Sequence, residues 1–250
     1  MSGGEIVLVA VAGLACGAIN ALAGGGSLVL FPALLATGMG SLAANVTNSV
    51  STWPGYIGSV SGFRDELRAE APRLRRLALV TVVGSVVGCT VLLLTPTGAF
   101  DRIVPVLVLF AAALLAGQPF VARRVGAPVD HAPRMRRAQL VAVGLASVYG
   151  GYFGAALGVI FLGVLALTID APLRQLNGLK SGLSLVDATV SVVIFGVFGP
   201  VQWTAVAVAA PATLVGGYIG ARLALRVNDA HLRYAIVAFA VAVAVVLFAR

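Results

Sequence analysis

Long apolar runs alternate with short polar connections along almost the whole chain of 250 residues. A bilayer core of roughly 30 Å takes about 20 apolar residues in helical form, so runs of this length predict membrane-spanning helices. Eight runs are long enough, and we expect helices at residues 6–23, 43–62, 77–94, 103–122, 140–157, 176–198, 201–221 and 234–249. Two shorter apolar runs, at 27–38 and 159–169, predict short or re-entrant segments. The pattern therefore predicts an all-α integral membrane bundle.

The composition supports this class and excludes others. Hydrophobic residues make up 60% of the chain and charged residues 10%, outside the usual range of soluble domains. A net charge of +8 does not indicate a nucleic-acid binder, because such proteins gather basic residues on a folded, water-facing surface. Here fifteen of the 17 Lys and Arg residues fall on one predicted side of the membrane, with only Arg102 and Arg250 opposite. The positive-inside rule makes that side cytoplasmic, so we expect both termini outside.

The two halves of the sequence resemble each other at a shift of 132 residues. This shift aligns Asn45 with Asn177 and Asn48 with Lys180, and it also aligns the pair Gly84 and Gly88 with the pair Gly216 and Gly220. Because each half holds five segments, an odd number, the second half must enter the membrane from the opposite face. We therefore expect two inverted-topology repeats, 1–122 and 138–250, joined by a basic cytoplasmic linker at 123–137.

Each half has a glycine-rich interruption after its first helix. Gly24, Gly25 and Gly26 precede Ser27 in the first half, and glycines recur between residues 150 and 158 in the second. Paired interruptions of this kind indicate a transporter's midplane site, since an unwound backbone and the following helix N-terminus can receive an anion. The alternative is that these glycines only allow close helix packing. Asn20, just before the first interruption, is a further candidate site residue.

Polar residues form matching stripes on two of the predicted helices. Spacings of three and four place them on one helical face. The first-half stripe consists of Asn45, Asn48 and Thr52, and the second-half stripe of Asn177, Lys180, Ser184 and Asp187, with the hydroxyls of Ser49 and Ser181 as further neutral donors. We expect the two stripes to converge in the middle of the protein and to bind a small anion through their amides and hydroxyls.

Lys180 and Asp187 are the ionisable members of these stripes. A charge near a helix centre costs about 2.5–3.5 kcal/mol on insertion scales, so each needs a reason to be there. Lys180, the one lysine of the chain, is the candidate charge partner of the anion, and the alternative is that it snorkels to the cytoplasmic interface. Asp187 is a candidate for carrying a coupling proton, and the alternative is a structural hydrogen bond to a neighbouring helix.

Other chemistry finds no support in the sequence. Cys16 and Cys89 lie within apolar helices without metal-ligand spacing, and neither glycine run has the form of a nucleotide-binding loop. His131 and His231 lie in or beside predicted loops, away from any matching nucleophile. We therefore expect no enzyme activity, no cofactor and no bound metal.

Four stretches together resemble the sulfite exporter TauE/SafE family, and they span nearly the whole chain. They are the segment from Gly17 to Ser27 with Pro32, the segment Ala44–Ser49, the segment Gln175–Lys180, and the segment Gly216–Ala224 after Trp203. The resemblance implies a bacterial cell-membrane permease for small sulfur-containing or organic anions, such as sulfite or a sulfonate. Relatives commonly have Asn where this sequence has Asp187, which leaves proton coupling open.

The leading hypothesis is therefore a secondary transporter of a small anion that works by alternating access. Two alternatives remain: a passive anion channel, and a membrane scaffold or enzyme subunit without a substrate of its own. The partners expected are the anion, the lipid bilayer and a coupling proton, but no nucleic acid. The sequence leaves open the identity of the anion, the direction of transport and whether the chain forms a homo-oligomer.

Overall fold

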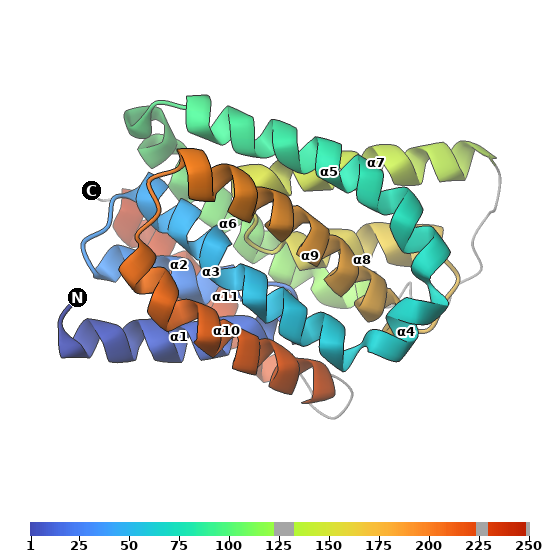
Figure 1. Ribbon diagram of the computed structural model, residues 1–250, viewed down its shortest axis with the longest axis horizontal. Helices are drawn as coiled ribbons and strands as arrows, with labels where there is room; N and C mark the ends of the chain where they lie inside the picture. The colour runs from blue at the N-terminus through green and yellow to red at the C-terminus, as the bar shows by residue number, and fades with distance from the viewer. Residues whose placement is uncertain (123–132, 224–229, 249–250) are drawn as a thin grey trace.

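The computed structural model describes residues 1–122, 133–223 and 230–248, which form eleven helices and no strand (Figure 1). In the first half they are α1 (Gly3–Leu22), α2 (Ser27–Ala36), α3 (Ser41–Gly62), α4 (Arg64–Ala69), α5 (Ala71–Leu94) and α6 (Thr97–Ala122). In the second half they are α7 (Pro133–Tyr152), α8 (Leu157–Thr168), α9 (Leu173–Phe198), α10 (Trp203–Leu223) and α11 (Ala230–Phe248).

Each of the ten predicted segments corresponds to a helix, and the differences lie at their ends. The prediction of a helix over 140–157 is wrong at its end: α7 stops at Tyr152, because the chain then adopts left-handed backbone conformations. The short helix α4 was not predicted. Residues 133–137, assigned to the linker, are the first turn of α7, and residues 123–132 lie outside the described part of the chain.

Within the described residues, five helices are both long and apolar enough to cross a membrane. They are α1, α5, α6, α9 and α10. Of the other long helices, α3 carries a polar stripe, and α7 begins with Arg134, Arg136 and Arg137. The apolar helices α2 and α8 and the apolar part of α11 are shorter. These helices make a multi-pass helical membrane protein, while the count of eight spans stays a prediction.

Glycines allow close packing between helices of different halves. α1 packs along α10, and α7 packs along α5. A Cβ at Gly216 or Gly220 of α10 would collide with backbone atoms of α1, and one at Gly84 or Gly88 of α5 would collide with α7. Small residues let membrane helices approach in this way. The two glycine pairs that align in the sequence therefore make equivalent contacts in the structure.

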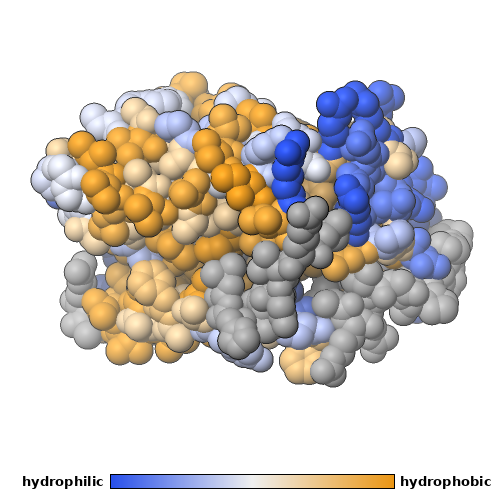
Figure 2. All heavy atoms as spheres, turned by 90° about the horizontal axis from the view of Figure 1, so that it is seen from below, coloured by the Kyte–Doolittle hydropathy of each residue, from blue (hydrophilic) through white to orange (hydrophobic). Residues whose placement is uncertain are grey.

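Polar and apolar surfaces are segregated along the length of the bundle. Figure 2 shows a broad hydrophobic surface over most of the visible face, with hydrophilic residues gathered at the end where α4 lies. At that end Arg174 of α9 forms an ion pair with Glu66 of α4, and Arg73 pairs with Glu70 at 2.7 Å. At the opposite end Arg102, Gly40 and Phe248 line one surface pocket, which places the end of α11 beside the α2–α3 connection and the start of α6.

Candidate functional site

The first break in the helical structure lies between α1 and α2. Gly24 has φ +84°, a backbone conformation that side chains rarely adopt. Asn20, in the last turns of α1, accepts a hydrogen bond from the Gly26 backbone N–H at 2.8 Å. Its amide nitrogen also lies 3.6 Å from the Cys16 sulfur. Asn20 is buried and ties the end of α1 to the start of α2 across the turn.

The second break lies at the equivalent place, between α7 and α8. Gly154 has φ +73° and Ala156 has φ +59°. Left-handed backbone at a residue other than glycine costs roughly 1–2 kcal/mol, so the surrounding structure must hold Ala156 in place. Part of that support comes from the Tyr149 hydroxyl, which donates to the Ala155 carbonyl at 2.7 Å.

The two breaks touch each other in the interior. A Cβ at Gly24 would lie 2.7 Å from the Cα of Gly158, closer than real side chains allow. Each break also receives a hydrogen bond from a helix of the other half. The Lys180 ammonium of α9 donates to the Ala21 carbonyl in the last turn of α1 at 3.0 Å. The Asn45 amide of α3 donates to the Tyr152 carbonyl at the end of α7 at 3.1 Å.

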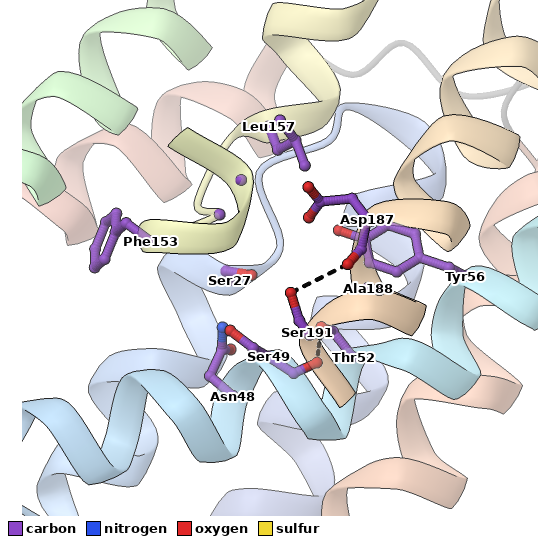
Figure 3. Close-up of a pocket in the computed structure, with 12 residues that line it drawn as sticks. Ser27, Asn48, Ser49, Thr52, Tyr56, Phe153, Leu157, Asp187, Ala188 and Ser191 are labelled. Atoms are coloured by element: carbon purple, nitrogen blue, oxygen red, sulfur yellow. Dashed lines mark hydrogen bonds between the residues drawn. The ribbon is translucent and has the colours of Figure 1, made fainter. Parts of the chain in front are cut away.

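A small polar cavity of about 20 Å³ lies beside the breaks (Figure 3). The N-terminal residues Ser27 of α2 and Leu157 of α8 reach it, and side chains of α3 and α9 line the rest. Its lining consists of Ser27, Asn48, Ser49, Thr52, Tyr56, Gly150, Phe153, Gly154, Leu157, Asp187, Ala188 and Ser191. The volume suits one water molecule, which needs roughly 10–15 Å³. A larger solute would require these helices to move apart.

Asp187 is the charged residue of the cavity wall and is 4% exposed. Its carboxylate lies 2.5 Å from the Ser85 hydroxyl of α5. Gly150 of α7 leaves room for it, because a Cβ there would lie 2.6 Å from the Asp187 Oδ1 atom. One turn further along α9, the Ser191 hydroxyl donates to the Asp187 backbone carbonyl at 3.1 Å. In Figure 3 Asp187, Ser27 and Ser191 surround the same space.

The predicted site residues fall into three groups. The cavity brings together Ser27, Asn48, Ser49, Thr52 and Asp187. Asn20, Gly24, Gly25 and Gly26 lie at the first break. Asn45 and Lys180 lie on α3 and α9 and donate hydrogen bonds to the residues beside the breaks. Asn177, Ser181 and Ser184 are buried on α9 but do not line the cavity. The cavity thus brings the two polar helices together only in part, at Asn48, Ser49 and Thr52 on α3 and at Asp187 on α9.

This geometry bears on two alternatives, a Lys180 that snorkels to the interface and an Asp187 that makes a structural hydrogen bond. Lys180 is 1% exposed, so the structure does not place its ammonium at a membrane interface. Asp187 does have the hydrogen-bonding contact to a neighbouring helix that a structural role would use, through Ser85.

Sequence reasoning missed several residues of the cavity. Ser191 continues the second stripe at a spacing of four after Asp187, and Tyr56 continues the first at a spacing of four after Thr52, so both could have been found by extending the stripes. Phe153 and Leu157 could not, since one apolar residue in an apolar run looks like another. Ser85, which contacts Asp187 but does not line the cavity, gives no signal either, because it lies on a predicted helix whose inward face the sequence does not mark.

Comparison with known proteins agrees with the helical membrane fold. The family model described as Sulfite exporter TauE/SafE matches residues 9–247. The "Probable membrane transporter protein YfcA" of Escherichia coli strain K12 is 28% identical over 223 residues, covering 88% of this chain and 79% of that one. The "Probable membrane transporter protein ORF9" of Sinorhizobium sp is 27% identical over 248 residues, covering 96% and 90%. No solved structure matches the chain. Since the family model covers nearly the whole sequence, the chain belongs to the sulfite exporter TauE/SafE family.

Proposed function

We propose that the protein is a secondary transporter of small anions that works by alternating access in a bacterial cell membrane. The observation that carries the proposal is the polar cavity beside two helix breaks that contact each other. Interrupted helices of this kind form the substrate sites of many transporters. The relatives' names, which describe probable membrane transporters, support the same class of function.

The cavity chemistry favours an anion as the substrate. The N-termini of α2 and α8 approach it through Ser27 and Leu157, and helix N-termini carry partial positive charge. Ser49 and Thr52 add hydroxyls, which in this state donate to the Asn45 and Ser49 carbonyls of their own helix, and Asn48, which is 2% exposed, adds an amide. The Asn48 Oδ1 atom has no hydrogen-bond partner among the described residues, but an amide oxygen only accepts, so it is the amide nitrogen of Asn48 that would donate to an anion. Lys180, bound to the first break, supplies positive charge from behind it.

The packing of the two halves supports alternating access by inverted repeats. Contacts come in equivalent pairs: α1 with α10 and α7 with α5, then α3 with α10 and α9 with α5. α3 and α9 pack on each other, as do α6 and α11. Transporters of this build expose a central site to either side by rocking one repeat against the other. A cavity of about 20 Å³ is too small for sulfite and fits a closed intermediate of such a cycle.

The family name favours sulfite or an organosulfonate, with other organic anions as further candidates. Purified protein in proteoliposomes tests this. We expect labelled sulfite or a sulfonate to accumulate inside against its own gradient when the vesicles are preloaded with the unlabelled anion. With the membrane potential clamped at zero, a passive channel would only equilibrate the anion. Absence of flux for every anion tried would favour a scaffold subunit and contradict the proposal.

The topology can be tested separately with single cysteines, after Cys16 and Cys89 have been replaced. We expect a cysteine at Arg68 or Arg134 to react only from the cytoplasm and one at Gly98 only from outside. This outcome would agree with both termini lying outside. Reaction of all three positions from the same side would contradict the inverted-repeat arrangement.

A further inference from the structure

The wall of the proposed anion cavity contains an acid. Asp187 is buried among neutral polar side chains, and none of the described residues that line the cavity is Lys or Arg. Two like charges about 4 Å apart in a protein repel strongly enough to weaken binding on the order of a thousandfold. An anion and an ionised Asp187 therefore compete for the same small space.

The hydrogen bonds around Ser85 allow Asp187 to exist in either charge state. The Ser85 hydroxyl lies 2.5 Å from the Asp187 carboxylate and 2.8 Å from the Thr81 carbonyl on its own helix. A hydroxyl has a single proton, so it can donate to only one of these acceptors at a time. If Asp187 is ionised, Ser85 donates to it. If Asp187 is protonated, it donates to Ser85, which in turn donates to Thr81.

We propose that Asp187 binds a proton together with the transported anion, so that the protein carries one proton with each anion. This inference rests on the proposed function and names its co-substrate. Rotation of the Ser85 hydroxyl keeps the carboxyl hydrogen-bonded in both states, so protonation does not leave a buried group unsatisfied. The glycine at position 150 leaves the carboxyl in contact with the cavity, where the anion binds.

Few other ionisable groups act on Asp187. α9 packs against α3, α4, α5, α7 and α8. α3 brings Tyr56, which lines the same cavity, and α5 brings Cys89, bonded to Ser191. α8 has no titratable residue, and α7 faces Asp187 with Gly150. The charged residues of α4, α5 and α7 lie at the hydrophilic end of the bundle, beside α4. Lys180 is about 10 Å from Asp187 along the axis of α9.

The step balances in protons and charge. On the loading side, a hydronium ion gives one proton to the Asp187 carboxylate as the anion enters and becomes water, so one O–H bond breaks and one forms. After the site opens to the other side the anion leaves, the O–H bond breaks, and the proton passes to water there. For a singly charged anion the net movement is electroneutral.

Methanesulfonate is a suitable probe, because a sulfonate is the anion of a strong acid and keeps one negative charge throughout the pH range of the assay. We expect its uptake into proteoliposomes to acidify a trapped pH dye by one proton per anion and to ignore an imposed membrane potential. Asp187→Asn should carry the anion without acidification and respond to the potential. Asp101→Asn, the same change at an exposed acid, should behave like the unmodified protein.

The unmodified protein alone can overturn the inference, so the test does not depend on the variant folding. Methanesulfonate uptake without acidification, or uptake driven by the membrane potential, would contradict it. So would proton movement that persists in Asp187→Asn. Failure of the unmodified protein to carry either sulfite or methanesulfonate would instead contradict the proposed function, and this inference with it.

Discussion

The two helix breaks have the same position in their halves but different chemistry. The first, between α1 and α2, consists of three consecutive glycines and receives a hydrogen bond from the charged Lys180. The second, between α7 and α8, places Ala156 in left-handed backbone and receives its bond from the neutral Asn45. The carbonyls that accept these bonds, of Ala21 and Tyr152, each belong to the last turn of a helix.

This difference indicates that the two breaks differ in backbone flexibility and in the charge of the group that binds them. Carbonyls in a last helical turn lack intrahelical partners and carry partial negative charge, which a cation neutralises better than an amide. The first break therefore combines a flexible backbone with a charged donor. The second has a stiffer backbone and a neutral donor. We infer that the first break is the more sensitive of the two to mutation.

The largest effect is expected where the breaks touch. Gly24→Ala adds a methyl group against Gly158 in a backbone conformation that alanine resists, and should destabilise the protein by about 2–5 kcal/mol and abolish transport. Gly38→Ala is the matched control, since Gly38 has φ +85° with open space around it. That change should cost only about 1–2 kcal/mol. Thermal unfolding in detergent measures both, and equal losses would contradict a tight contact between the breaks.

The next effect concerns the charged donor. Lys180→Met keeps most of the buried stem but removes the ammonium, and should lower anion flux by more than about tenfold while costing about 1–3 kcal/mol for the carbonyl left without this donor. Lys180→Arg should not restore flux, because the stem of Lys180 packs against Gly158 and a planar guanidinium does not have the geometry of the compact ammonium that donates to the Ala21 carbonyl. Flux assays with folding controls decide this. Normal transport by Lys180→Met would remove Lys180 from the proposed site.

A smaller effect is expected at the neutral donor. Asn45→Ala removes the hydrogen bond to the Tyr152 carbonyl and should cost about 1 kcal/mol and lower flux a few-fold. Asn177→Ala is the control at the repeat-equivalent position, because the buried Asn177 side chain makes no such hydrogen bond to a described residue, and this change should leave flux nearly normal. If Asn45→Ala impaired transport as severely as Lys180→Met, the second break would be as sensitive to the loss of its hydrogen-bond donor as the first.

The sequence predicted the helices and the first break well, the second break only through its glycines and not in its position, and the site only in part. Polar residues within apolar helices are conspicuous, so Asn48, Thr52 and Asp187 were identified before the cavity was known. The end of α7 was missed because residues 140–157 are continuously apolar, and hydropathy does not register a change of φ. Phe153 and Leu157 were missed for a related reason. Lipid is as apolar as the protein interior, so hydropathy does not tell which face of a helix points inward.

The smallest effect is expected at Ala156, and its size tests whether the second break is strained. Ala156→Gly relieves the left-handed backbone by roughly 1–2 kcal/mol. It also gives the unfolded chain more freedom, which costs about 0.5–1 kcal/mol, and removes a buried methyl group worth about 0.8 kcal/mol. These contributions nearly cancel, so the unfolding midpoint should barely move and flux should stay normal. A stabilisation well above about 1 kcal/mol would mean that the second break stores more strain than its backbone angles indicate. A large loss of stability would mean that the Ala156 methyl group packs more tightly than its burial indicates.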